Sequence, residues 1–218
     1  MNHDDEVIPA FEEMFKSILL FSFAGSGIKL RNYQEKVALA IVDSVINQRG
    51  MTFVVIFPRQ SGKNELQAQL ETYLLTLYHF KDSEMVKVSP TWKPQSLNAM
   101  RRLQRVLRGN VMVEGAEKYW AKEQGYIFRV ENARIYFLSG APASNVVGAT
   151  ASTLLECDEA QDVLISKWDK EIAPMAASTN ATRVFWGTAW TSKTLLAREK
   201  RAALEAQKKD GRQRGFIM

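Results

Sequence analysis

The apolar segment at residues 51–57, MTFVVIF, constrains the fold more than any other feature of the chain. It is short, continuously apolar and rich in β-branched residues, and Pro58 follows it directly. Such a segment predicts a strand that is buried on both of its faces. Strands of this kind belong to parallel sheets that are covered by helices on both sides.

The rest of the chain alternates between helical and strand patterns. Helices are predicted at residues 6–23, 32–48, 63–78, 94–107, 167–177 and 194–209. Further strands are predicted at 85–88, 126–130, 134–138, 153–157 and 182–186, with 126–130 and 134–138 forming a hairpin. This alternation predicts an α/β fold with a mostly parallel central sheet flanked by helices, whose ligands bind at the carboxyl ends of the strands.

The composition is that of one ordinary globular domain, with 218 residues of which 46% are hydrophobic and 24% charged. The single cysteine, Cys157, excludes an intramolecular disulfide and is typical of a reducing compartment. No apolar run reaches the ~18 residues of a membrane span, and residues 18–24 do not resemble a signal peptide. We therefore expect an intracellular protein without membrane association.

The charge is concentrated near the C-terminus. Residues 193–214 hold eight Lys or Arg and three Asp or Glu, so they account for the whole net charge of +5. The predicted helix at 194–209 is therefore basic, and it is either a solvated surface or a contact for a phosphate backbone or an acidic partner.

The residues after the first predicted strand, FPRQSGKN at 57–64, have the features of a Walker A loop. Such a loop turns tightly after a strand, so that backbone N–H groups and the N-terminus of the next helix face phosphate oxygens, which a Lys also contacts. Gly62 and Lys63 occupy the corresponding positions. The predicted phosphate-binding residues are Arg59, Gln60, Ser61, Gly62, Lys63 and Asn64, and Arg59 and Lys63 are also predicted to take part in catalysis.

Two positions depart from the usual G-x-x-x-x-G-K-[ST] pattern. Phe57 stands where the first Gly is expected, and Asn64 replaces the hydroxyl residue that binds magnesium. The side-chain carbonyl oxygen of Asn64 is a ligand that Mg²⁺ accepts. An ordinary strand–turn–helix remains the alternative for this motif alone.

A pair of acidic residues, Asp158 and Glu159, follows the predicted strand at 153–157. ATP hydrolysis needs one carboxylate for the metal and a second that orients and deprotonates the attacking water. We predict that Asp158 binds magnesium, that Glu159 is the catalytic base and that Gln161 helps to position water. Two solvated acids at the start of a turn are the alternative.

Gly187 and Thr188 follow the predicted strand at 182–186, which would end beside the other two motifs. A hydroxyl group at this place can sense the γ-phosphate, so we predict a coupling role for the pair. The alternative is a simple Gly-Thr turn.

Together these residues resemble the ATPase domain of the large terminase subunit, the motor that packages DNA into tailed-phage heads. The resemblance covers roughly residues 28–198 and rests on RQSGK at 59–63, on the acidic pair followed by Ala160, and on Gly187-Thr188. It implies a P-loop NTPase fold of the RecA-like (ASCE) class. It also implies that Tyr33 stacks on adenine and that Gln34 bonds the edge of the base, although a helix N-terminus with one buried ring would explain both residues.

The chain departs from this family in two respects. Relatives carry an Arg-Gly pair before the catalytic Glu, whereas this sequence has Val147-Gly148, so Arg101, Arg102 or Arg105 would have to act on the nucleotide of a neighbouring subunit instead. Relatives also continue into a nuclease domain, whose acidic motifs this chain lacks. We expect a single ATPase domain with a helical segment at 1–30, a nucleotide-binding core at 31–192 and a basic helix at 193–218 that begins a linker.

The resemblance implies ATP as substrate, Mg²⁺ as cofactor and translocation of double-stranded DNA into a capsid. Its implied partners are double-stranded DNA, the portal protein, the small terminase subunit and further copies of the chain, in the cytoplasm of the phage host. In isolation we expect a monomer. The alternatives are a superfamily 2 helicase-like translocase, which shares the Asp-Glu-Ala sequence, and a nucleotide-binding scaffold with a degenerate loop.

Overall fold

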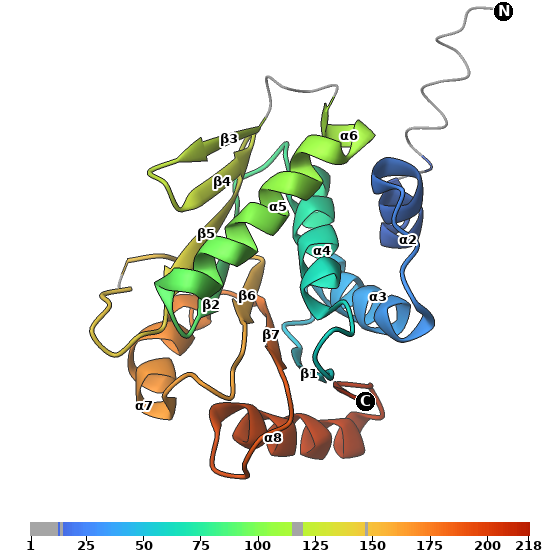
Figure 1. Cartoon of the computed structure of the whole chain (residues 1–218). Coiled ribbons are helices and arrows are strands. Elements are labelled where there is room, and N and C mark those ends of the chain that lie inside the picture. The colour runs from blue at the N-terminus through green and yellow to red at the C-terminus, as the bar shows by residue number, and fades with distance from the viewer. Residues whose placement is uncertain (1–12, 14, 115–119, 147) are drawn as a thin grey trace, which may run out of the picture.

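The computed structural model describes residue 13 and residues 15–114, 120–146 and 148–218. These residues form an eight-stranded sheet with helices on both faces (Figure 1). The strands lie in the order β3-β4-β5-β2-β6-β7-β1-β8. Their bounds are β1 (Thr52–Ile56), β2 (Ser83–Ser89), β3 (Trp120–Glu123), β4 (Ile127–Val130), β5 (Ala133–Ser139), β6 (Leu154–Cys157), β7 (Thr182–Gly187) and β8 (Gly215–Ile217).

The sheet is mostly parallel, which confirms the predicted fold class. All pairings from β5 through β2, β6, β7 and β1 to β8 are parallel. Among the described strands, β4 pairs antiparallel with both of its neighbours, β3 and β5, and its pairing with β5 is the predicted hairpin. Strands β6, β7 and β1 are adjacent, so the segments that follow their carboxyl ends lie side by side.

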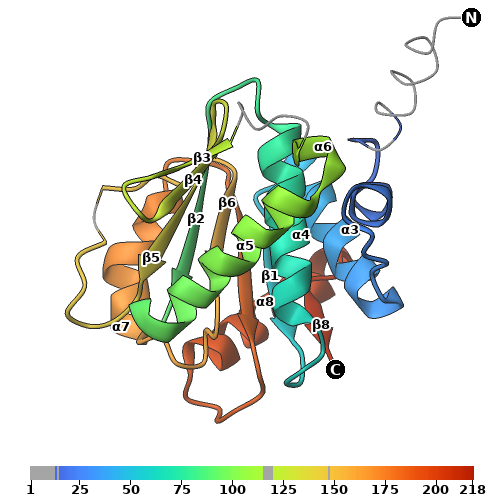
Figure 2. The same cartoon turned by 45° about the horizontal axis from the view of Figure 1, so that its top comes forward.

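In the described part of the chain, four long helices cover the sheet. Helices α3, α4 and α5 lie on one face, and α8 lies on the other beside the short α7 (Figure 2). Their bounds are α3 (Asn32–Ile46), α4 (Lys63–Leu77), α5 (Leu97–Gly109), α7 (Ile165–Lys167) and α8 (Leu195–Asp210). Shorter helical elements are α2 (Ile18–Leu20), α6 (Val111–Glu114) and the turns Phe21–Gly25, Trp92–Ser96, Trp168–Ile172 and Ala173–Ala176.

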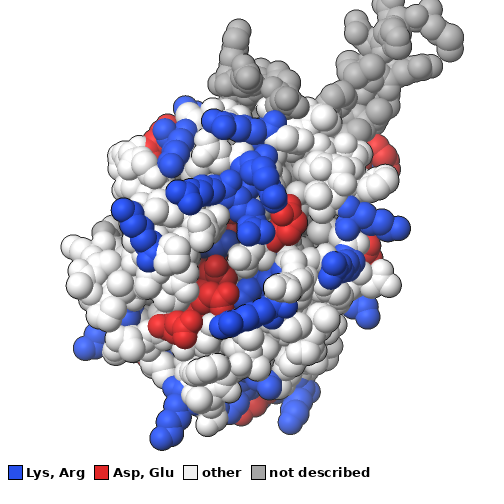
Figure 3. Space-filling view, in the orientation of Figure 1, with Lys and Arg blue, Asp and Glu red and all other residues white. Residues whose placement is uncertain are grey.

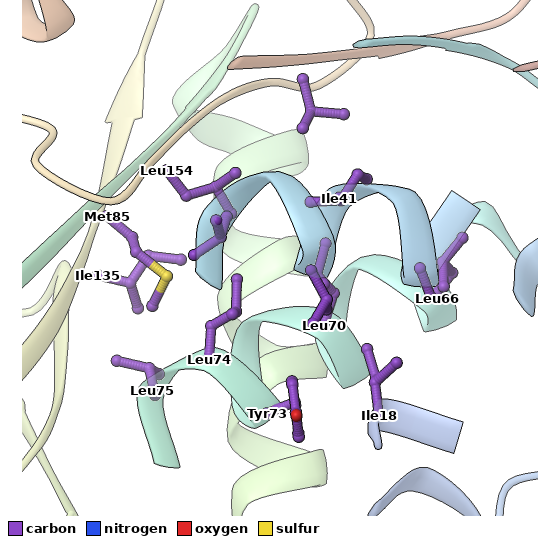
Figure 4. Close-up of a cluster of buried hydrophobic side chains, with 14 of the residues drawn as sticks. Ile18, Ile41, Leu66, Leu70, Tyr73, Leu74, Leu75, Met85, Ile135 and Leu154 are labelled. Atoms are coloured by element: carbon purple, nitrogen blue, oxygen red, sulfur yellow. The ribbon is translucent and has the colours of Figure 1, made fainter. Parts of the chain in front are cut away.

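The sheet separates two hydrophobic clusters. Phe53 and Val55 of β1 pack with the helices α3 to α5, and their neighbours Val54 and Ile56 pack with the opposite side. Figure 4 shows part of the first cluster, where α4 lies against α3 and the sheet. Each fully buried side chain of this size contributes about 1.5–3 kcal/mol. Strand β1 is therefore buried on both faces, as its sequence predicts.

Two sequence predictions need correction. The predicted helix at 6–23 is interrupted at Ser17, whose backbone is extended and whose hydroxyl accepts a hydrogen bond from Leu19 N to cap α2; residues 6–12 and 14 lie outside the described part. Strands β3 and β8 were not predicted, because segments of four and three residues carry too little periodicity. The segment Gly215–Ile217 adds a strand beside β1 instead of ending as an unpaired apolar tail.

Helix α8 confirms the predicted basic helix. The hydroxyl of Thr194 accepts a hydrogen bond from Ala197 N at its start, and Gly211 ends it with a φ of 72°. Within the described residues, no helix is both long enough and apolar enough to span a membrane.

Candidate active site

The structure brings the three predicted motifs together at the carboxyl edge of the sheet. The Walker A segment follows β1, the acidic pair follows β6, and Gly187 and Thr188 lie at the end of β7. The backbone N–H of Phe57 donates to the carbonyl oxygen of Gly187 at 3.1 Å, and that of Ala160 donates to Trp186 at 2.9 Å. These bonds join neighbouring strand ends into one rim.

The loop between β1 and α4 turns through two residues with positive φ, Gln60 at 63° and Gly62 at 79°. Gly62 immediately precedes α4, so the N-terminus of this helix opens toward the loop. A Cβ atom at Gly62 would lie 2.7 Å from Nε2 of Gln34. Both the conformation and this close approach therefore require glycine.

Phe57, which replaces the usual first glycine, points into the core. Its side chain is fully buried, and its ring meets that of Tyr33 edge to face at a centroid distance of 5.2 Å. The departure from the usual motif therefore adds one core residue directly after strand β1, before the turn at Gln60 and Gly62.

Tyr33 and Gln34, at the start of α3, form hydrogen bonds with the loop between β1 and α4. The hydroxyl of Tyr33 donates to Ser61 O at 2.6 Å, and Nε2 of Gln34 donates to Gly62 O at 3.1 Å. Oε1 of Gln34 accepts a hydrogen bond from Arg31 N at 2.9 Å, so its amide already has partners on both atoms. Adenine binding by this pair stays a prediction; the contacts assign both residues a bracing role.

Glu159 lies between two donors. Nζ of the buried Lys63 donates to Oε1 at 2.7 Å, and Nε2 of Gln161 donates to Oε2 at 2.7 Å. The backbone of Glu159 has a φ of 44°, in the left-handed region that a residue with a Cβ seldom adopts. Strain of this kind is common at functional sites.

Asp158 is hydrogen-bonded to a chain of buried polar side chains that the sequence analysis did not predict. Nε2 of Gln67 donates to Oδ1 of Asp158 at 3.0 Å, and Nζ of Lys87 donates to Oε1 of Gln67 at 2.9 Å and to Oε1 of Glu71 at 2.5 Å. Only 2% of Lys87 and 1% of Glu71 are exposed. The sequence offered one sign of this chain, the charged Lys87 inside the predicted strand at 85–88. Its partners could not be predicted, because they depend on how α4 packs on β2.

Burial and neighbouring charges shift the pKa values of the ionisable groups in and beside this chain. Burial raises the pKa of Glu71, and burial together with the neighbouring Glu71 raises that of Glu156 well above the usual value. Burial alone would lower the pKa of Lys87, but Glu71 and Glu156 raise it. Oε2 of Glu71 and Oε2 of Glu156 are buried and have no hydrogen-bond partner among the described residues.

Two adjoining cavities open at this rim. One of about 400 Å³ is lined by residues 58–64, and one of about 690 Å³ extends over Asp158 and Gln161. The residues that line both are Arg59, Asn64, Arg102, Glu159 and Thr188. Arg102 comes from α5, 4.0 Å from Glu65, which also pairs with Arg105. Figure 3 shows acidic side chains in the middle of this face with Lys and Arg side chains around them.

The residues of the smaller cavity suit a phosphate group. The hydroxyl of Ser61 is buried and has no hydrogen-bond partner among the described residues, beside the N-terminus of α4 and the ammonium of Lys63. The described residues contain no cluster of three His, Cys, Asp or Glu for a metal. Asn64 and Asp158 line the larger cavity together, and two protein oxygens suffice for Mg²⁺ because this ion keeps several waters.

The three arginines predicted to replace the missing trans-acting arginine lie in different places in the structure. Arg102 lines both cavities of its own chain, whereas Arg105 pairs with Glu65 and Arg101 lines neither cavity. Val147, at the position of the missing arginine, lies outside the described residues.

No family model matches the sequence, and no curated protein matches it. Several solved structures are similar to the chain. The large terminase of bacteriophage HK97 superposes with a TM-score of 0.76 at 16% identity, over 93% of this chain and 43% of that protein. The large terminase ATPase domain of Thermus phage P74-26 gives 0.59 at 19% identity, over 77% of this chain and 68% of that domain.

The large terminase of the thermophilic bacteriophage D6E gives a TM-score of 0.62 at 12% identity, over 88% of this chain and 45% of that protein, which has also been solved with ADP. The chain thus spans less than half the length of the HK97 and D6E proteins. At these identities the likeness establishes the fold, and the resemblance inferred from the motifs is confirmed at that level. The chain has the fold of the ATPase domain of phage large terminases.

Proposed function

We propose that this chain is the ATPase domain of a motor that uses ATP hydrolysis to move double-stranded DNA into a viral capsid. The observation that carries the proposal is the position of Glu159, whose carboxylate meets Lys63 at the end of the phosphate-binding loop. This places a potential base beside the cation that would contact the outer phosphates of ATP.

In this proposal the loop residues bind the triphosphate. The backbone N–H groups of residues 59–63 and the N-terminus of α4 would surround the phosphates, with Lys63 near the outer ones. The exposed guanidinium of Arg59 adds positive charge at the mouth of both cavities. The hydroxyl of Ser61 has no other partner and would donate to a phosphate oxygen.

Glu159 would accept the proton of the attacking water, since a carboxylate is a suitable general base. Gln161 fixes the second oxygen of this carboxylate. Asn64 and Asp158 would hold Mg²⁺, with waters completing the shell. Bound Mg²⁺ would neutralise charge on the phosphates. Thr188, beside both cavities, would couple the state of the site to the segment that leads to α8.

A superfamily 2 helicase-like translocase and a nucleotide-binding scaffold are the alternatives. The scaffold was suggested by Phe57 and Asn64, but Phe57 is a core residue and Asn64 reaches the larger cavity. A scaffold would not require a carboxylate bonded through both oxygens beside the loop lysine.

The proposed partners are double-stranded DNA, a portal protein, a small terminase subunit and other copies of the chain, in the cytoplasm of a phage host. Basic residues suit DNA, and α5 and α8, on opposite faces of the sheet, each carry several Lys or Arg. No nuclease activity is proposed for this chain.

The test is phosphate release from ATP and magnesium, with and without duplex DNA, for the wild type and for Glu159→Gln. The Gln variant retains shape but cannot accept the proton, so turnover should fall ~10²-fold or more while nucleotide still binds. Glu205→Gln, on the exposed side of α8, is the matched control and should keep the parent rate. Equal rates for the parent and Glu159→Gln would refute the assignment, and strand separation of duplex DNA would favour the helicase-like alternative.

A further inference from the structure

Gln161 connects the candidate base to the neighbouring strand end. Its Nε2 donates to Oε2 of Glu159 at 2.7 Å and to Oδ2 of Asp162 at 3.2 Å. Its Oε1 accepts a hydrogen bond from Thr188 N at 3.2 Å. Both N–H groups and the carbonyl oxygen of the amide are therefore engaged, which fixes the orientation of the side chain.

Position 187 requires glycine because the side chain of Gln161 lies close to its backbone. A Cβ atom at this position would lie 2.5 Å from Oε1 of Gln161 and would also contact Cδ2 of Leu196, near the start of α8. Gly187 does not have a positive φ, so the close approach of these two side chains is the reason for glycine. The amide of Gln161, the end of β7 and the first turn of α8 are in direct contact.

Nucleotide binding would change the environment of this amide. The ammonium of Lys63 donates to Oε1 of Glu159, and phosphate oxygens would compete with this carboxylate for its three N–H groups. Where a phosphate draws Lys63 away, Gln161 stays as the partner of the Glu159 carboxylate. The side chain of Gln161 is hydrogen-bonded to the Glu159 carboxylate at one end and to Thr188 N at the other, so a movement of the carboxylate can reach Thr188 through it.

We propose that Gln161 is a positioning residue that holds the Glu159 carboxylate and transmits its state to Thr188 and the segment leading to α8. This inference rests on the proposed function, because it assigns Glu159 to the reaction. Trp190 lies two residues beyond Thr188, is 77% exposed and lines the larger cavity, so it can report movement of this segment.

The test uses Gln161→Met, which has similar length but cannot form these hydrogen bonds, with the exposed Gln213→Ala as the control. Turnover should fall roughly 10-fold in Gln161→Met, the loss expected for one hydrogen bond to a charged group. The KM for ATP should stay within about twofold, because the phosphate contacts are retained.

A second readout separates coupling from a merely structural role. Nucleotide should change tryptophan fluorescence in the wild type, and Trp190→Phe should remove that change. Gln161→Met should bind nucleotide by calorimetry but show no change at Trp190, while Gln213→Ala should behave as the wild type. In the nucleotide-free protein, hydrogen exchange of the Thr188 amide should be faster in Gln161→Met.

Two results would overturn the role of Gln161 and leave the proposed function intact. One is a Gln161→Met protein with the parent turnover and the parent fluorescence change. The other is a wild type that binds and hydrolyses ATP with no change at Trp190. Failure to bind nucleotide, or an active Glu159→Gln variant, would instead refute the proposed function, and the role of Gln161 with it.

Discussion

Nζ of Lys63 lies 2.7 Å from Oε1 of Glu159, so the lysine of the phosphate-binding loop is paired with the candidate base. Lys63 is mostly buried, whereas Glu159 is a quarter exposed at 25%. The ammonium has three N–H donors, so phosphate oxygens would compete with this carboxylate for them. We therefore expect nucleotide to weaken the pair.

Replacing Lys63 with alanine should weaken nucleotide binding. The change removes a cation whose hydrogen bonds to phosphate are charge-assisted, so the affinity should fall about 10-fold or more. Calorimetric titration of the variant with ATP would measure this, with Lys209→Ala on exposed α8 as the control. An unchanged affinity would show that Lys63 does not contact the phosphates.

Asn64→Thr should preserve magnesium-dependent hydrolysis. Asn64 is exposed at the mouth of both cavities, and Thr supplies the hydroxyl ligand that is usual at this position. The measurement is ATP turnover as a function of magnesium concentration in the two proteins. Complete loss of activity in the variant would mean that the side chain of Asn64 has another role.

Lys87→Met should destabilise the protein strongly, because it leaves the buried carboxylate of Glu71 without its cation. Removing one partner of a buried ion pair costs about 3–5 kcal/mol, which urea denaturation would detect. Lys208→Met on the surface should have little effect. The double variant Lys87→Met with Glu71→Gln should recover much of the loss, and simple additivity of the two changes would contradict this account.

The parts of the site that lie in single short segments were predictable from the sequence. The apolar run before Phe57, the Gly62-Lys63 pair and the acids after a buried strand each have a local pattern, and parallel strand order brings them to one edge. The chain from Lys87 through Gln67 to Asp158 joins three elements, so no local pattern indicates it. Strand β8 was missed because its three residues carry too little periodicity, and its partner β1 lies far away in sequence.

The last prediction concerns assembly and DNA. A motor on duplex DNA needs several subunits around it, and the trans-acting arginine that the resemblance implies is absent from residues 145–148. We expect the isolated chain to be monomeric with weak ATPase activity. The basic residues of α8 and of Arg101–Arg108 should bind DNA without sequence preference, with a dissociation constant on the order of 10⁻⁴–10⁻⁶ M that rises with salt.

Full activity should require a portal protein or neighbouring subunits that bring an arginine to the γ-phosphate, a contribution of roughly 10³–10⁵ in rate where such residues have been studied. Sedimentation and turnover, both measured against protein concentration, would check this together. Turnover per subunit should rise with concentration if a neighbour completes the site. A stable ring in solution, or fast turnover at every concentration, would contradict the prediction. An arginine of the same chain would then be the better candidate, either Arg59 or Arg102, since both line the two cavities.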